Sequence, residues 1–137
     1  MENCLFCNII EGNVPSTKVY EDEHVYAFLD INPINVGHTL VIPKEHCADI
    51  HDIPEDTLQH IMSVVKKLST AIKKSTELDG INISMNNGKA AGQIIFHSHI
   101  HIIPRFEKDG FEPWKSKREY KEGEAAKIAE RIQEELL

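Results

Sequence analysis

The sequence predicts an α+β fold, because short apolar runs typical of strands lie on both sides of one long amphipathic helix. A second, shorter helical pattern closes the chain. The length of 137 residues fits a single domain over 1–137 and is enough to bury a core without disulfide bonds. We therefore expect a sheet of about five strands covered by helices.

Three strands are expected in the first third of the chain. The segment 18–30 carries two strand-like pieces separated at 22–23, and the second is apolar enough that both its faces are expected to be covered. A turn follows at 32–33, and the apolar run at 38–43 predicts the third strand.

A long helix is expected between Pro54 and Gly80. Pro54 suits a first helical turn, and Gly80 is a stop signal. Glu55 and Asp56 complement the positive end of the helix dipole. The expected apolar stripe comprises Leu58, Ile61, Met62, Val65, Leu68 and Ile72. The expected solvated face carries Lys66, Lys67, Lys73 and Lys74.

Two further strands are expected at 81–86 and 94–103, joined by a loop at 87–93 and ended by Pro104. A final helix is expected from about Lys121 to the end of the chain. Its expected apolar stripe comprises Ala125, Ile128, Ala129, Ile132 and Leu136.

The charge and hydropathy of the chain restrict its class of function. A net charge of −7 argues against a nucleic-acid-binding protein, which needs a basic face, but it leaves room for a small anionic ligand. Neither an export signal nor an apolar run of about 18 residues is present, so no membrane partner is expected. We expect a cytoplasmic protein whose thiols are reduced.

Three histidines at every second position are the strongest chemical signal. On the expected strand at 94–103, His97, His99 and His101 share one face, with neighbours roughly 7 Å apart. Such a row is a poor core, because each buried ring nitrogen needs a partner. Two interpretations stay open: a His-x-His metal-ligand pair, or a nucleophilic imidazole whose neighbours orient it and supply protons. A neutral imidazole suits attack on an anionic phosphate.

Cys4 and Cys7 form a Cys-x-x-Cys pair, whose spacing fits zinc binding or redox chemistry. The thioredoxin-like interpretation is disfavoured because no βαβ unit surrounds the pair, and inert thiols are the third alternative. Cys47 is expected to be a small, buried apolar residue. The histidines without a group of partners are expected at the surface: His24, His51 and His60.

Between about residues 4 and 105, these motifs occur in an order that resembles the histidine triad (HIT) family, in its zinc-binding bacterial and archaeal form. The matching blocks are Cys4-Leu5-Phe6-Cys7-Asn8-Ile9-Ile10, Phe28-Leu29-Asp30-Ile31-Asn32-Pro33, residues 37–46, Gly92-Gln93, His97-x-His99-x-His101 and Pro104-Arg105. Each block alone is modest, but the ordered set is highly specific. The remainder, about 106–137, is expected to be a C-terminal helical extension.

The resemblance implies an antiparallel sheet, a homodimer and an enzyme that cleaves a purine nucleotide conjugate at the α-phosphate. The implied conjugates are phosphoramidates or dinucleoside polyphosphates. His99 would be the nucleophile and would be transiently nucleotidylated before water releases the nucleoside monophosphate. His101 would contact the phosphate and assist the leaving group, and His38 would support the triad from behind.

The resemblance also implies how the nucleotide is held. Asp30 matches the acidic residue that binds both ribose hydroxyls, and a carboxylate can do so with charge-assisted hydrogen bonds. Asn86 matches a polar residue near the ribose and phosphate. The loop with Gly92 and Gln93 is expected to direct N–H groups at the phosphate, although a simple connection is the alternative. The apolar walls around the base would be Phe6, Ile9, Phe28 and Ile31.

Some HIT proteins hold zinc with such a cysteine pair and two distant histidines. By position, the implied ligands here are Cys4, Cys7, His46 and His97. This set is tetrahedral and structural, and it leaves no open coordination position for chemistry.

The chain departs from the family pattern at two positions. Ile94 stands where many members have a Ser or Thr that contacts the phosphate or leaving group, and Ser98 stands where an apolar residue is usual. Ser98 is expected on the face opposite the triad, so its effect should be on packing.

Two other functions stay open at this point. The chain could be a nucleotide-binding interaction protein with only incidental hydrolysis, or a metal hydrolase that uses the triad itself as zinc ligands. Metal on the cysteine set would leave His99 free as a nucleophile, whereas metal on His99 and His101 would reverse the mechanism.

Overall fold

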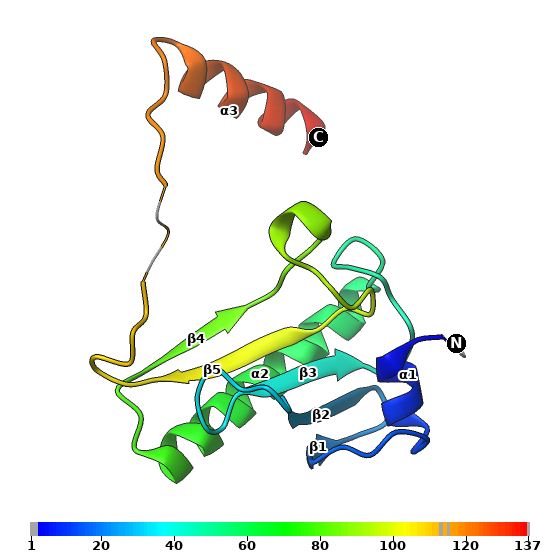
Figure 1. Cartoon of the computed structure of the whole chain (residues 1–137). Helices are drawn as coiled ribbons and strands as arrows, with labels where there is room; N and C mark the ends of the chain where they lie inside the picture. The colour runs from blue at the N-terminus through cyan, green and yellow to red at the C-terminus, as the bar shows by residue number, and fades with distance from the viewer. Residues whose placement is uncertain (1–2, 113, 115, 137) are drawn as a thin grey trace.

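The structure is a computed structural model that describes residues 3–112, 114 and 116–136 (Figure 1). Within these residues, one antiparallel sheet has the strand order β1-β2-β3-β5-β4. The elements are α1 (Leu5–Ile10), β1 (Lys18–Glu21), β2 (Val25–Leu29), β3 (Thr39–Pro43), α2 (Glu55–Thr76), β4 (Gly80–Ser84), a 3-10 turn at Lys89–Ala91, β5 (Ile100–Arg105) and α3 (Glu124–Glu135). The predicted α+β class is confirmed.

The two faces of the sheet bury two separate apolar clusters. The first lies against α2 and includes Val41 and Ile102 from neighbouring strands. The second lies on the opposite face, where Phe6 and Ile9 of α1 pack on Phe28 and other residues of β2 and β3. In the sequence of β5, His101 lies between Ile100 and Ile102, which both belong to the first cluster. Because side chains alternate along a strand, His101 points to the second face. The prediction that both faces of β2 are covered is confirmed.

The long helix was predicted well, but its ends and one residue of its stripe were not. Pro54 is the N-cap and not part of the first turn, and α2 ends at Thr76, followed by Glu77 in a left-handed conformation. Gly80 is instead the first residue of β4. Met62 is exposed and Val64 is buried in its place. Val64 follows Ile61 by three positions and therefore shares its face, whereas Met62 lies about 100° around the helix. The expected solvated face is confirmed: Lys66, Lys67, Lys73 and Lys74 are exposed.

The strand predicted over 94–103 begins only at Ile100 and continues to Arg105. The segment before it is held by other contacts, because the N–H of Ser98 donates to the carbonyl of Cys47, 2.7 Å away, rather than to a sheet neighbour. His97 and His99 therefore precede the strand. Pro104 lies inside β5 and does not end it. It follows Ile102, the last residue of β5 paired with β3, so β5 has no strand neighbour on that side there.

Helix α1 was missed, because six residues are too few to show a helical period. Its N-cap is Cys4, whose Sγ accepts the N–H of Cys7 at 3.4 Å. The strand predicted at 81–86 ends at Ser84, so Asn86 lies in the following loop.

The C-terminal helix forms, but its expected stripe is not buried. Helix α3 stands apart from the sheet (Figure 1). All of its residues are exposed, including Ile128 and Ile132. The described residues contain no helix with the length and apolar character needed to cross a membrane. The assignment of 1–137 to one domain stays a prediction.

Candidate functional site

The first part of the site is a cluster of two cysteines and two histidines: Cys4, Cys7, His46 and His97. Helix α1 and its N-cap supply the two thiols, and His46 and His97 come from the segments after β3 and before β5. The Nδ1 atom of His97 lies 3.4 Å from Cys4 Sγ and 3.5 Å from Cys7 Sγ. Cys7 Sγ lies 3.4 Å from His46 Nδ1. The structure thus assembles the four predicted ligands.

The geometry and donor chemistry of this cluster fit zinc. Tetrahedral zinc, with bonds of about 2.3 Å to sulfur and 2.0–2.1 Å to nitrogen, places neighbouring S and N ligands about 3.6 Å apart. His97 Nε2 donates to the carbonyl of Pro43 at 2.8 Å, which directs the Nδ1 lone pair into the cluster. Burial lowers the pKa of His97 to about 4, so the ring is neutral at pH 7, as a metal ligand must be.

The second part of the site is the buried imidazole of His99. Its Nδ1 lies 2.8 Å from the carbonyl oxygen of His97, which can only accept a hydrogen bond. The ring proton therefore sits on Nδ1, and the lone pair is on Nε2. Burial lowers the pKa of His99, which keeps the ring neutral at pH 7. His99 is thus an oriented imidazole with an unprotonated Nε2.

His101 and His38 form a hydrogen-bonded pair beside His99. The backbone N–H of Ile34 donates to His38 Nδ1 at 3.1 Å, so the proton of neutral His38 is on Nε2. That Nε2 lies 2.9 Å from His101 Nδ1, which must accept, so the proton of His101 is on its own Nε2. Burial lowers the pKa of both rings, that of His101 to about 4. His101 is therefore a neutral N–H donor, 5.0 Å from the ring of His99 between centroids.

Asp30, His38 and His101 form a second group of side chains whose types and spacing could hold a metal ion. Two nitrogens on one tetrahedral metal ion lie about 3.3 Å apart, because each metal–nitrogen bond is about 2.0–2.1 Å. The 2.9 Å between His38 Nε2 and His101 Nδ1 is instead the length of a hydrogen bond. The geometry favours the hydrogen-bonded pair over a metal site.

Phe6 joins the two parts of the site. Its ring makes edge-on contacts with His97 and His99, at 5.9 and 5.1 Å between centroids, and with Phe28 at 5.4 Å. Phe6 lies on α1 between the two cysteines, so any shift of that helix would be transmitted to His99. Ile9, which was also predicted to line the base, belongs to the same apolar cluster as Phe6 and Phe28.

The remaining predicted nucleotide contacts lie on two loops. Asp30 follows β2 and is partly exposed, with its Oδ2 3.7 Å from His38 Nε2, and Ile31 beside it is open to solvent. In the loop before β5, Asn86 Nδ2 donates to the Gly92 carbonyl at 3.5 Å. Gly92 has φ +92°, a conformation that L side chains rarely adopt.

The predicted contact Gln93 is buried and has internal partners. Its Oε1 accepts the N–H of Gly88, and its Nε2 donates to the carbonyls of Ala48 and Ile95. Gln93 therefore shapes the loop from within. Of the departures from the family pattern, Ile94 is exposed, and Ser98 is buried with a hydroxyl that has no hydrogen-bond partner among the described residues.

His60 lies at the surface, as predicted, with a side chain that is 41% exposed, but the prediction that it has no group of partners is wrong. Its Nε2 lies 2.7 Å from Asp22 Oδ2, and its ring packs edge-on against His24. His51 is exposed, as predicted, and Cys47 is buried, as predicted. The sequence did not indicate the backbone groups that fix the ring protons, because every residue carries an N–H or a carbonyl.

Comparisons with a family model and with known proteins point to the same family. The model of the HIT domain matches residues 11–108. Protein hit from Bacillus subtilis is 46% identical over 138 residues, which cover 98% of this chain and 95% of that protein. Adenosine 5'-monophosphoramidase HNT1 from Candida albicans is 46% identical over 107 residues, which cover 75% of this chain and 70% of that protein.

Solved structures share the fold. SMU.412c from Streptococcus mutans superposes with a TM-score of 0.93 at 43% identity, covering 100% of this chain and 87% of that chain. A Zn-bound histidine triad family protein from Mycobacterium smegmatis has a TM-score of 0.77 at 36% identity, covering 98% of this chain and 96% of that chain.

Proposed function

The chain belongs to the HIT domain family, and from this premise we propose that it hydrolyses or transfers nucleotidyl groups through a covalent intermediate on His99. The substrate would be a purine nucleotide conjugate cleaved at its α-phosphate. The observation that carries the proposal is the hydrogen bond from His99 Nδ1 to the His97 carbonyl, because it leaves the Nε2 lone pair free to attack. The name of the Candida albicans relative, a phosphoramidase, supports the reaction class.

In the first step, the lone pair of His99 Nε2 forms a bond to the α-phosphorus. The bond from phosphorus to the leaving atom breaks, and its electron pair departs with the leaving group, which takes a proton from water if it is a basic nitrogen. The nucleotidylated ring becomes cationic, and the His97 carbonyl that accepts Nδ1–H stabilises this charge. His101, whose proton is on Nε2 because its Nδ1 accepts from His38, would donate to a phosphate oxygen or to the leaving atom.

In the second step, the oxygen of a water molecule bonds to phosphorus. The electron pair of the P–N bond returns to His99 Nε2, and the water loses a proton to solvent. The products are the nucleoside monophosphate and the free enzyme. Attack by an alcohol or amine in place of water would give transfer, so the same geometry supports both reactions.

We place the nucleoside between Asp30 and the apolar residues of α1 and β2. Asp30 is partly exposed beside the His38–His101 pair, as a group that binds ribose hydroxyls must be. Phe6, Ile9 and Phe28 back the site as its apolar wall, and exposed Ile31 could cover the base. Asn86 and the loop with Gly92 and Gln93 would border the phosphate.

Asp30→Asn should weaken AMP binding more than binding of 2′,3′-dideoxy-AMP. A neutral amide loses the charge-assisted hydrogen bonds to the ribose hydroxyls, which are worth roughly 1.5–3 kcal/mol. Titration calorimetry with both ligands measures the difference, and the exposed acidic residue Glu23, changed to Gln, is a matched control. An equal loss for the two ligands would show that Asp30 does not contact the sugar.

Zinc on Cys4, Cys7, His46 and His97 is also part of the proposal. When bound, it would supply a structural cross-link and no direct chemistry, because four protein ligands fill its tetrahedron. Reduced thiol ligands suit the cytoplasm, where we place the protein.

We further propose that the protein acts as a homodimer. Two features of the described residues support this assembly. Strand β4 is an edge of the sheet with exposed Ile83, and the apolar side of α3 is exposed.

A nucleotide-binding interaction protein would share the nucleotide-binding residues but would not need an oriented nucleophile. Product analysis with nucleotides that bear P–N, P–F and polyphosphate leaving groups separates the two functions. An enzyme should release the same monophosphate from at least one class at a rate that depends on His99. Tight binding with no turnover of any class would favour the interaction protein.

A further inference from the structure

We propose that Asn35 is a positioning residue: anchored by Asp109 and Pro104, it holds the His38–His101 pair in one tautomer. The inference rests on the proposed function, which uses the Nε2–H of His101. Asn35 and Asp109 lie outside the HIT motifs described above.

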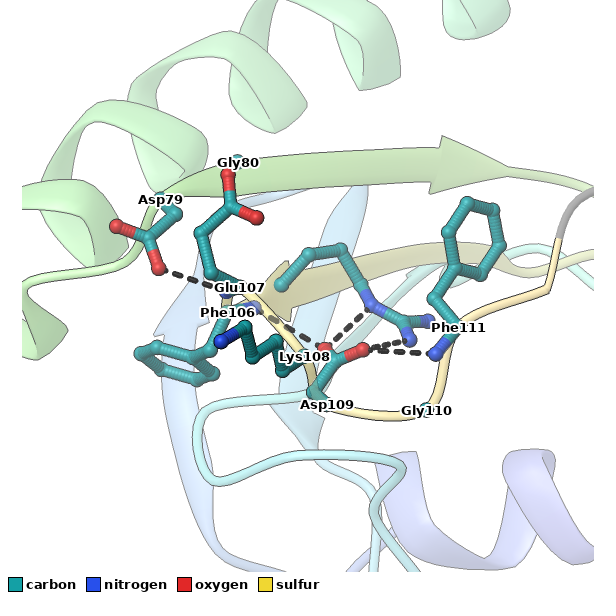
Figure 2. Close-up of a pocket in the computed structure, with 9 residues that line it drawn as sticks. Asp79, Gly80, Phe106, Glu107, Lys108, Asp109, Gly110 and Phe111 are labelled. Carbon is teal, nitrogen blue, oxygen red and sulfur yellow. Dashed lines mark hydrogen bonds and ion pairs between the residues drawn. The ribbon is translucent and has the colours of Figure 1, made fainter.

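The anchor is a nearly buried carboxylate at the end of β5. Asp109 accepts two hydrogen bonds from the Arg105 guanidinium, at 2.9 and 2.7 Å, and its side chain is 9% exposed. It also accepts the backbone N–H groups of Phe106 and Phe111, each at 3.0 Å (Figure 2). Arg105 and these N–H groups hold the pKa of Asp109 well below its usual range. Asp109 is therefore a fixed anion at neutral pH.

Asn35 ties the loop between β2 and β3 to this anchor. Its Nδ2 donates to Asp109 Oδ2 at 2.9 Å and to the Pro104 carbonyl at 2.8 Å, which uses both amide protons. Its own backbone carbonyl accepts the N–H of His38 at 3.0 Å. The side chains of its neighbours Ile34 and Val36 are exposed. Asn35 is therefore the residue of this stretch that connects the loop to Pro104 and Asp109.

The position of this loop determines which nitrogen of His38 carries the proton. The N–H of Ile34, directly before Asn35, points at His38 Nδ1 from 3.1 Å and forces that nitrogen to accept. His38 must then donate from Nε2 to His101 Nδ1, which leaves the His101 proton on Nε2. If the loop moved and this N–H were lost, both rings could exchange tautomers and His101 could no longer donate into the site.

The test is the tautomeric state of the histidines in the full-length protein, read by long-range ¹H–¹⁵N NMR correlation at neutral pH. In the natural sequence, His38 and His101 should both be Nε2–H tautomers. Asn35→Ala should give a mixture of tautomers for this pair. Its kcat should fall about tenfold, a part of the 10²–10⁴-fold that positioned acid–base groups contribute. AMP affinity should stay within about twofold.

Two further variants make the test specific. Val36→Ala changes an exposed side chain of the same loop and should leave the tautomers and kcat unchanged. Asp109→Asn removes the anchoring charge from the other side and should act in the same direction as Asn35→Ala. The NMR spectrum itself reports whether each variant is folded.

Unchanged tautomers in folded Asn35→Ala and Asp109→Asn would overturn the proposal. A changed tautomer with an unchanged kcat would support the positioning by Asn35 and count against the proposed role of His101. The failure of the inference is therefore distinguishable from the failure of the proposed function.

Discussion

His99→Ala should abolish turnover while the protein still binds AMP within about tenfold of its original affinity. The imidazole supplies the attacking lone pair, so its loss falls on the transition state and not on the ground state of a bound monophosphate. Steady-state kinetics with adenosine 5′-phosphoramidate and calorimetry with AMP measure the two quantities. His99→Asn should give the same separation while retaining a polar side chain.

The matched control is His51→Ala, which removes an exposed loop histidine. It should change neither turnover nor affinity. Normal turnover by folded His99→Ala would refute His99 as the nucleophile. A loss of AMP binding as large as the loss of turnover would show that the residue contributes to binding instead.

The second large effect is expected at the cysteine cluster. Purified protein should contain one zinc ion per chain, and the double variant Cys4→Ser, Cys7→Ser should contain none. Metal that binds only the folded state adds to folding free energy, so the melting temperature should fall by about 10 °C. Elemental analysis and calorimetric melting give the readouts.

Loss of zinc should also weaken nucleotide binding, because α1 carries Phe6 as well as the cysteines. Turnover at saturating substrate should fall less than in His99→Ala, since the nucleophile remains in place. Cys47→Ala is the matched control, because Cys47 is a buried thiol outside the cluster and its loss should leave the zinc content unchanged. Metal-free protein that is equally stable and equally active with and without added zinc would refute the site.

The residues of the candidate site could be picked out from the sequence because metal binding and nucleophilic chemistry depend on residue types. Cysteine and histidine are scarce and reactive, so a Cys-x-x-Cys pair and three alternating histidines stand out. The resemblance to the HIT family then indicated His46 as a partner for a cysteine pair that lies far from it in sequence. The structure brings these four residues together.

The sequence could not predict which ring nitrogens are protonated. Those protons are fixed by the carbonyls of Pro43 and His97 and by the N–H of Ile34. Backbone groups are the same in every residue, so only the fold shows which of them face a side chain. The contact of Asn35 with Asp109 was missed for a related reason, because it joins residues 74 positions apart.

The errors in the fold follow from the limits of periodicity. The alternation of residue types predicted a strand over 94–103, but in 94–99 contacts with other loops replace the hydrogen bonds between strands. For α3 the amphipathic pattern predicted a helix correctly. The pattern shows that one side of a helix is apolar, but it does not show what covers that side.

The covalent intermediate is the central claim, and rapid-quench mass spectrometry tests it most directly. Protein mixed with excess adenosine 5′-phosphoramidate should be quenched in alkali, because a P–N bond to histidine is labile in acid, and then digested and sequenced. The account predicts an adenylyl group on His99 that forms and decays at the rate of turnover. Turnover without any adenylated peptide, or with the group on another residue, would contradict it.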